Sequence, residues 1–318
     1  MNNRGFSGTT RLVVFLATFA VLTALPQGSV AGTDGGRTAA DFLQIGWGAR
    51  AAAMSDAFTA VSRGADATYW NPAGLAAMDS PAEISFGHLS WYQGVSVEHG
   101  AAAFRIGNRL TAGAALTFLS YGSIDGYGRD GSATGSAVTA FDWALGLSGA
   151  LSLTDDLALG ASARVVNQRL DDINAEAIGF DVGIGWDLGS IRLAAAAANL
   201  GSELDFEGVR ASQPTMIRAG AAIRPFGPNL LTAIEVRQSW SGTTTLRHGV
   251  EVAFDDTYFL RGGYSLFPGD DARGLIQQTA IGAGLRWEAV EIDYAYGAAD
   301  QFSDESVHRL TLHFSLGR

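Results

Sequence analysis

Apolar residues alternate with small or polar residues at a period of two along most of the chain, from residue 82 to near the end. The clearest stretch is 178–188, where glycine or aspartate separates the apolar residues Ile178, Phe180, Val182, Ile184, Trp186 and Leu188. A period of two is that of a β-strand, whose successive side chains point to opposite faces of the sheet. The pattern therefore predicts an all-β fold.

The alternation divides into about fourteen strands, each close to the length that a tilted strand needs to cross the apolar layer of a bilayer. The predicted strands are 82–93, 95–106, 109–122, 139–152, 157–169, 175–188, 190–200, 214–225, 229–240, 244–254, 257–266, 275–287, 289–298 and 306–316. Tight turns alternate with longer polar connections, of which the longest are 123–138, 200–213, 267–274 and 299–305. Short turns at one end and long loops at the other are typical of an antiparallel transmembrane barrel in an outer membrane.

The second face of these strands carries isolated charges and much of the chain's glycine, which makes up 41 of the 318 residues. We expect this face to line a narrow interior. The inward charges predicted by alternation are Asp142, Arg164, Asp181, Arg218, Glu235, Arg237, Arg247, Glu251, Arg261, Arg286, Glu291, Asp293 and Arg309. Both signs are mixed, and unpaired buried charges are costly. We therefore expect ion pairs across the interior and a filled barrel rather than an open pore.

The register can be tested at neighbouring residues of one strand. Phe180 and Trp186 should face lipid, whereas Asp181 and Asp187 should face the interior. An arginine at a lipid-facing position near the membrane centre costs about 2–4 kcal/mol. We expect that cost for Phe180→Arg and a far smaller one for Gly183→Ala.

Residues 1–31 have the pattern of a secretory signal peptide. Two arginines precede the apolar run 12–25, and small residues stand at Ser29 and Ala31. The alternative, a membrane anchor, would need a run of about 20 apolar residues.

Composition excludes several classes of function. Without cysteine there is no disulfide and no thiolate zinc site. The net charge of −11 disfavours nucleic acid as a partner. The spacings of the five histidines do not fit a helical zinc site, and no Gly-x-Ser-x-Gly motif occurs. Barrel lipases do not need that motif, but the sequence offers no other catalytic set. We expect no enzymatic activity, metal or cofactor.

Residues 32–80 do not alternate. Met54, Ala57, Phe58 and Val61 lie on one stripe at helical spacing, so a short helix is predicted over 49–61, and Asn71-Pro72 predicts a turn.

The same region resembles the start of the PorV/PorQ family, a branch of the FadL-like outer-membrane barrels. The resemblance is dense over residues 41–76, with one departure at Ser55, where the family usually has glycine. It rests above all on Phe42, Gly46, Gly48, Arg50, Met54, Trp70, Asn71, Pro72, Ala73 and Gly74.

The resemblance implies a fourteen-stranded barrel over 81–318 with residues 32–80 folded inside as a hatch. Some relatives belong to the type IX secretion system, where they receive secreted proteins at the outer membrane. The implied partners are then outer-membrane lipid and either secreted proteins or secretion-system components. FadL itself passes hydrophobic molecules, so passive transport of a hydrophobic ligand is the alternative. In either case we expect Phe42, Trp47, Met54 and Phe58 to be buried in the interior, and Arg50 to pair with an acid of the wall.

Overall fold

The computed structural model describes residues 38–91, 94–128, 130–240, 242–266, 279–297 and 307–317. The expected signal peptide and the predicted loops at 267–274 and 299–305 lie outside the described residues. In the described part of the chain, no helix is both long and apolar enough to span a membrane.

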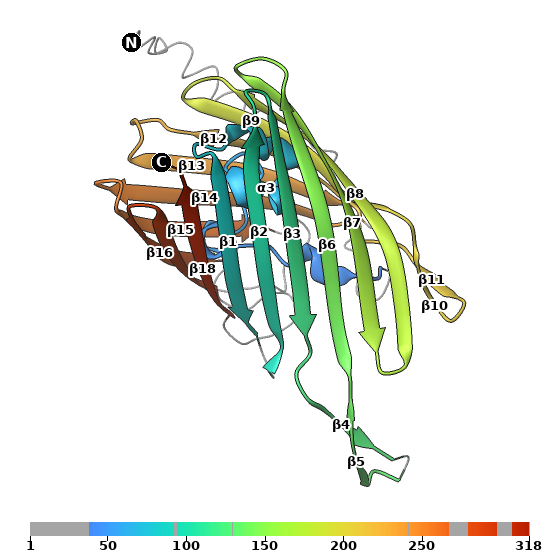
Figure 1. Ribbon diagram of the computed structural model, residues 1–318. Helices are drawn as coiled ribbons and strands as arrows, with labels where there is room; N and C mark the ends of the chain where they lie inside the picture. Colours follow the sequence, from blue (N-terminus) through green and yellow to red (C-terminus); the bar gives the residue numbers. More distant parts are fainter. Residues whose placement is uncertain are drawn as a thin grey trace. The chain divides into compact units, whose positions relative to one another are not determined.

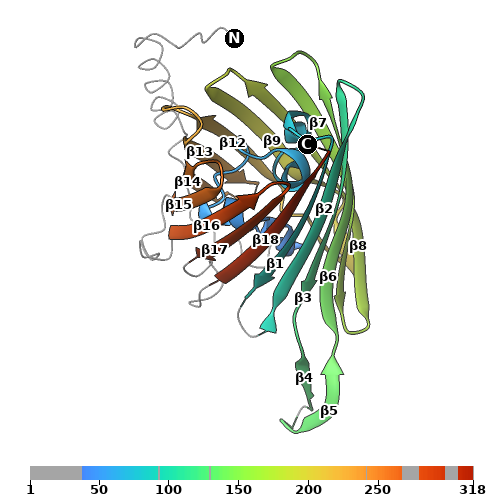
Figure 2. The ribbon, with the colours of Figure 1, turned by 60° about the vertical axis from the view of Figure 1, so that its left-hand side comes forward.

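Fourteen antiparallel strands close into one barrel, as the alternation predicted (Figures 1 and 2). Each strand pairs with its neighbour along the chain, and β1 pairs with β18 to complete the ring. The strands of the wall are β1 (Ala82–Ser90), β2 (Ser96–Ile106), β3 (Leu110–Ser120), β6 (Ala140–Ser152), β7 (Leu157–Leu170), β8 (Ile173–Asp187), β9 (Ile191–Gly201), β12 (Met216–Ile223), β13 (Leu230–Ser239), β14 (Thr244–Phe254), β15 (Tyr258–Leu266), β16 (Thr279–Trp287), β17 (Val290–Gly297) and β18 (Val307–Leu316).

Two connections that the sequence analysis treated as loops contain hairpins. The first is β4 (Ile124–Tyr127) with β5 (Ala133–Val138), and the second is β10 (Leu204–Phe206) with β11 (Val209–Ala211). Figure 1 shows both at the same end of the barrel. In the second hairpin, the two loop residues Glu207 and Gly208 have φ angles of 54° and 94°. Two positive φ angles are what a tight hairpin turn needs, and a Glu-Gly pair is a weaker sequence signal for it than Asn-Gly.

The predicted register of β8 is confirmed. Phe180 and Trp186 are each 49% exposed on the outer face, whereas Asp181 is 2% exposed on the inner face. Leucine, isoleucine and phenylalanine also cover the outer face of the other long strands. Such an apolar exterior on a closed barrel faces lipid.

The N-terminal segment, residues 38–80, packs against the inner face of the wall as a series of short helical turns (Figure 2). Phe42, Trp47, Met54 and Phe58 are all buried, as expected. The turns are η1 (Asp41–Gln44), α2 (Ala49–Ala53), η2 (Gly64–Asp66), α3 (Ala67–Trp70) and η3 (Pro72–Ala77).

The helix predicted over 49–61 is wrong beyond its first turn. Helix α2 ends at Ala53, and the next turn places Ser55 and Asp56 in the left-handed region, with φ angles of 50° and 60°. Wall side chains then bind the chain that follows: Glu235 accepts hydrogen bonds from the backbone of Phe58 and Thr59. These tertiary contacts replace the helical hydrogen bonds that the apolar stripe suggested.

Candidate functional site: the filled lumen

Wall glycines make room for the N-terminal segment. A Cβ atom at Gly160 would overlap the backbone of Pro72 and Ala73, and one at Gly183 would overlap the amide of Asn71. The backbone of Met54 is equally close to Gly249 and Gly263. The inward glycines noted in the sequence are therefore contact points at which only a residue without a side chain allows the segment to approach.

The Asn71-Pro72 turn is fixed from both sides. Asn71 Oδ1 accepts a hydrogen bond of 3.1 Å from the backbone N–H of Ala73 and so caps the start of η3, where Pro72 fits the first helical position. Asn71 Nδ2 donates to the carbonyl of Ile184 in the wall, also at 3.1 Å. Gly74 lies so close to the carbonyl of Ser62 that a Cβ would clash. One asparagine thus both shapes the turn and attaches it to β8.

The other glycines of the motif also have structural reasons. Gly48 precedes α2 with a φ of 87°, which a side chain would strain. A Cβ at Gly46 would lie 2.5 Å from the Asp56 carboxylate. The carbonyl of Gly46 accepts a hydrogen bond of 2.5 Å from Arg309 Nη1 of the wall. Trp70 links the two halves of the motif, since its Nε1 donates to the carbonyl of Trp47 at 3.0 Å.

Besides the inward charges that form ion pairs, several others bind the segment itself through its backbone or a neutral side chain. Glu235 Oε2 accepts from the backbone nitrogens of Phe58 and Thr59, at 3.0 and 2.8 Å. Arg237 donates to the side-chain amide of Gln44 at 2.8 Å, and Arg309 binds the backbone. Irregular backbone needs such partners when it is buried, and the wall charges supply them.

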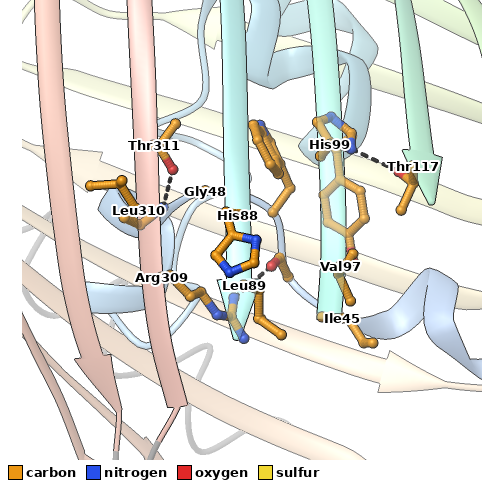
Figure 3. Close-up of a pocket in the computed structure, with 14 residues that line it drawn as sticks. Ile45, Gly48, His88, Leu89, Val97, His99, Thr117, Arg309, Leu310 and Thr311 are labelled. Carbon is orange, nitrogen blue, oxygen red and sulfur yellow. Dashed lines mark hydrogen bonds between the residues drawn. The ribbon is translucent and has the colours of Figure 1, made fainter. Parts of the chain in front are cut away.

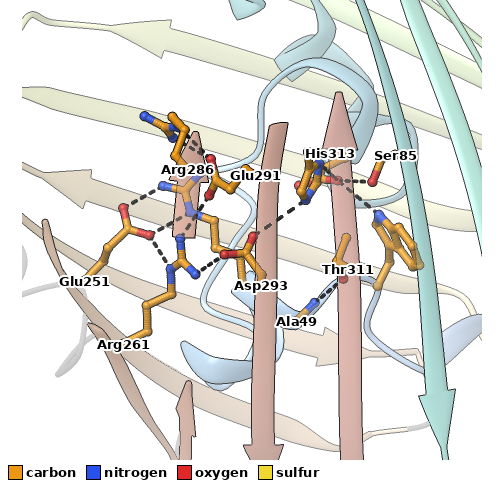
Figure 4. Close-up of polar contacts among 12 residues, drawn as sticks. Ala49, Ser85, Glu251, Arg261, Arg286, Glu291, Asp293, Thr311 and His313 are labelled. Atoms are coloured by element: carbon orange, nitrogen blue, oxygen red, sulfur yellow. Dashed lines mark hydrogen bonds and ion pairs between the residues drawn. The ribbon is translucent and has the colours of Figure 1, made fainter. Parts of the chain in front are cut away.

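A cluster of ion pairs surrounds Arg261 (Figure 4). Its guanidinium contacts Glu251 at 2.6 Å, Glu291 at 3.2 Å and Asp293, and its side chain is fully buried. Arg286 adds a second cation at 2.6 Å from Glu291. Arg50 of the N-terminal segment binds Glu251 through two hydrogen bonds of 2.7 Å, which confirms that Arg50 pairs with a wall acid.

His313 of β18 connects this cluster to the N-terminal segment a second time. The imidazole lies between two carboxylates, with Nε2 3.8 Å from Asp293 and Nδ1 3.7 Å from Asp66. Asp66 belongs to the segment and also accepts a hydrogen bond of 3.1 Å from Trp47 Nε1. Polar contacts therefore hold the segment to the wall at both ends of one connected cluster.

Two further ion pairs lie elsewhere in the lumen. Arg247 of β14 binds Asp56 at 2.9 Å, next to the left-handed turn. Arg164 pairs with Asp181 on the neighbouring strand and donates to Asn199 at 2.8 Å. Asn199 has a φ of 59° at a break in the pairing of β8 with β9, and Asp181 accepts from its backbone at 2.8 Å. This inward pair therefore stabilises a β-bulge in the wall.

Two other predicted lumen charges also have no ionic partner among the described residues. Arg218 stacks on the rings of Tyr69 and Trp70, with its guanidinium carbon 5.1 Å from each ring centre. Asp142 accepts hydrogen bonds of 2.9 Å from Tyr121 and Gln168. Cation–π contacts and neutral donors here take the place of the expected ion pairs.

Two small pockets remain between the segment and the wall, with cavity volumes of about 20 and 40 Å³. They share Tyr69, His99 and Thr117 as lining residues. Figure 3 shows the first pocket, where His99 Nδ1 lies 2.7 Å from the Thr117 hydroxyl. The Trp47 ring stacks on His99 with 3.7 Å between ring centres. Within the described part of the chain, no three acidic or histidine side chains gather in a way that would hold a metal ion.

Sequence reasoning missed several residues that fix the segment. Asp56 was not singled out, although it binds the wall, and Tyr69 was missed as a lining residue. Thr311 accepts a hydrogen bond of 2.8 Å from the backbone of Ala49. The alternation of β18 did place Thr311 and His313 inward. Their partners in the N-terminal segment, Ala49 and Asp66, could not be read from it, because they lie more than 200 residues away.

The sequence and the structure both match known proteins. A profile of the type IX secretion system protein PorV matches residues 33–260. No curated protein matches the sequence. Among solved structures, the Pseudomonas putida toluene transporter TodX superposes with a TM-score of 0.62 at 12% identity, over 86% of this chain and 99% of that one.

Two other solved structures give the same result. The CymD monoaromatic hydrocarbon channel has a TM-score of 0.61 at 13% identity, over 86% of this chain and 98% of that one. A Pseudomonas aeruginosa FadL homologue has a TM-score of 0.57 at 13% identity, over 85% and 98%. At these identities the likeness concerns the fold.

Proposed function

Because this chain belongs to the family of the type IX secretion system protein PorV, we propose that it takes part in delivering exported proteins at the cell surface. The chain is an outer-membrane β-barrel of a non-enzymatic family. In this role the barrel is a membrane-anchored platform whose partners are components of the secretion system or the proteins that it exports.

The observation that carries this proposal is the filled lumen. Ion pairs at Arg50 and Asp56 attach the N-terminal segment to the wall, and Glu235 and Arg309 bind its backbone. Wall glycines bring that backbone into direct contact. A segment held at so many points favours a barrel that works through its surface rather than through an open pore.

The long-loop end, which is extracellular by the usual topology of such barrels, offers the surface. The β4–β5 and β10–β11 hairpins lie there, outside the wall strands. Tyr127 on the first is 66% exposed and Val209 on the second is 70% exposed. Large apolar side chains that face water rather than lipid are typical of protein-binding sites.

The test is the replacement of residues 124–138 by a short Gly-Ser linker in the chromosomal gene. Strands β3 and β6 pair directly with each other, from Ser120 opposite Phe141 to Leu110 opposite Leu151. The barrel should therefore still fold without the hairpin and show heat-modifiable gel mobility. We expect proteins that use the type IX route to accumulate in the periplasm and to disappear from the cell surface. Surface proteomics and periplasmic fractionation measure both.

A matched control separates the hairpin from general damage to the barrel. Tyr127→Ser should reproduce part of the export defect, whereas Phe226→Ser, at an even more exposed position in a short turn of the opposite end, should not. Normal export by a folded variant without residues 124–138, together with normal export after deletion of the whole gene, would refute the proposal.

The two pockets beside His99 support a second candidate, passive transport of a hydrophobic molecule. This function would require the N-terminal segment to move, because the segment forms one side of both pockets. It predicts that deletion of the gene slows uptake of a radiolabelled aromatic hydrocarbon and leaves protein export intact. The export role predicts the opposite result for the same deletion.

A further inference from the structure

Three arginines meet at the short-turn end of the lumen. Arg192 lies near the start of β9, Arg224 follows the last residue of β12, and Arg63 belongs to the N-terminal segment. Strands β9 and β12 are paired, with Arg192 opposite Ala222, and the backbone N–H of Arg224 donates to Ser190 at 2.9 Å. Arg63 lies 3.6 Å from Asp187, the residue opposite Arg192 on β8.

Arg192 is buried without a partner. Its relative exposure is 5%, and Nη1 is shielded from solvent with no hydrogen-bond acceptor. Among the described residues its side chain forms no hydrogen bond and no ion pair. The guanidinium lies over Gly185, where an added Cβ would be 3.3 Å from Nη2, with Ala73 of η3 nearby. A guanidinium in this environment pays the cost of desolvation without the compensation of an acceptor.

The acids nearby do not compensate for this charge. Asp187 and Asp79 lie 3.6 and 4.0 Å from Arg63, and their side chains are 41% and 70% exposed. Within the described residues the Arg224 side chain has no ion pair. Three guanidinium groups thus have two partly exposed carboxylates beside them, both of which contact Arg63, in a chain whose net charge is −11. This local excess of positive charge is opposite in sign to the net charge of the whole chain.

We propose that Arg63, Arg192 and Arg224 form a binding site for one oxyanion, a phosphate or carboxylate group that enters from the periplasm. Guanidinium groups bind both through paired, charge-assisted hydrogen bonds. The Arg192 guanidinium has no acceptor in the described part of the protein, and Arg224 and the one-third-exposed Arg63 add positive charge beside it. Strand alternation places Arg192 on the inner face, so the ligand is a solute or a solvent-exposed group rather than a phospholipid of the surrounding leaflet.

Isothermal titration of the full barrel in a non-ionic detergent tests the site. Sodium phosphate and sodium acetate are titrated separately, in Tris chloride buffer at constant ionic strength, so that the two chemistries are compared directly. We expect saturable binding of one anion per barrel. R192Q and R224Q should each weaken it at least tenfold, which corresponds to about 1.4 kcal/mol or more.

R109Q is the matched control. Arg109 is exposed in another short turn at the same end of the barrel, and its replacement by glutamine removes the same charge. Its affinity should equal that of the unchanged protein. Heat-modifiable mobility shows which variants are folded, and R224Q decides the question if R192Q does not fold. Absence of saturable binding of both anions, or unchanged affinity in the folded variants, would overturn the proposal.

Discussion

Arg50 of the N-terminal segment and Glu251 of the barrel wall share two hydrogen bonds of 2.7 Å across 201 residues of sequence. Glu251 also contacts Arg261, so one carboxylate joins the segment to the buried cluster of the wall. The pair is a direct ionic link between the part of the chain that fills the lumen and the part that encloses it.

Glu251→Gln should weaken this link. The amide cannot neutralise two buried guanidinium groups, and breaking a buried pair from one side costs about 3 kcal/mol or more. We expect a lower midpoint in urea unfolding followed by heat-modifiable mobility. Glu98→Gln is the control: its partner His88 is half exposed on the outer face, and such pairs are worth at most about 1 kcal/mol. Equal midpoints for the two variants would contradict this assignment.

Gly183→Ala should destabilise the barrel, contrary to the expectation from sequence alone. The new methyl group would overlap the Asn71 side chain, which is fixed by its bonds to Ala73 and Ile184. Overpacking of this kind costs about 1–3 kcal/mol. Gly149→Ala, where an added Cβ has no neighbour within 4 Å, should change the urea midpoint little. A tolerated Gly183→Ala would mean that the Asn71 turn is not seated on β8.

Ser55→Gly should stabilise the protein. Ser55 has a φ of 50°, and L-residues other than glycine pay about 1 kcal/mol in this region. Part of the gain is lost to the greater freedom of glycine in the unfolded chain. The expected net effect is a small rise in the unfolding midpoint, together with a fall for Ser55→Val, since a β-branched residue fits this conformation poorly. This position is also where the family usually has glycine.

Removal of residues 41–70 should leave a barrel that still inserts into a bilayer but conducts ions. The fourteen strands pair without the segment, whereas the lumen would lose most of the side chains that fill it. Single-channel conductance in planar bilayers should rise well above that of the full chain. The variant without residues 124–138 controls for loss of chain length, and its conductance should not change. Equal conductance of the full chain and the 41–70 deletion would show that the segment does not close the pore.

Low pH should weaken the attachment of the N-terminal segment to the wall at the Asp56–Arg247 ion pair. Burial alone would raise the pKa of this carboxyl, but Arg247, Arg309 and Arg237 outweigh it and hold the pKa below its ordinary 3.8. A depressed pKa contributes stability above the unfolded value, and that contribution is lost as the pH falls through the folded pKa. We expect the fluorescence of Trp47 and Trp70 to change below pH 3.8. Asp56→Asn should remove that component of the titration, and an identical titration would contradict the role of Asp56.

The sequence by itself determined the barrel and its register. Alternation at a period of two gives each strand one lipid face and one inner face, and a shift by one residue would move every apolar side chain to the wrong side. This constraint is local, so Phe180 and Asp181 could be placed on opposite faces without any knowledge of their neighbours. The motif over residues 41–76 is also contiguous in the sequence, and two of its features, the positive φ of Gly48 and the Asn71-Pro72 turn, meet local backbone requirements.

Only the tertiary structure decided what the inner face does. Helix α2 stops at Ala53 because wall charges bind the backbone beyond it, and helical spacing carries no information about Glu235, which lies 177 residues from Phe58. Whether position 183 tolerates a residue larger than glycine likewise depends on Asn71. Whether Arg192 has a partner depends on which residues of β8 and η3 surround it. Contacts inside a barrel are set by which strands close the ring and by how the enclosed segment is threaded, so their partners are distant in sequence and follow no local period.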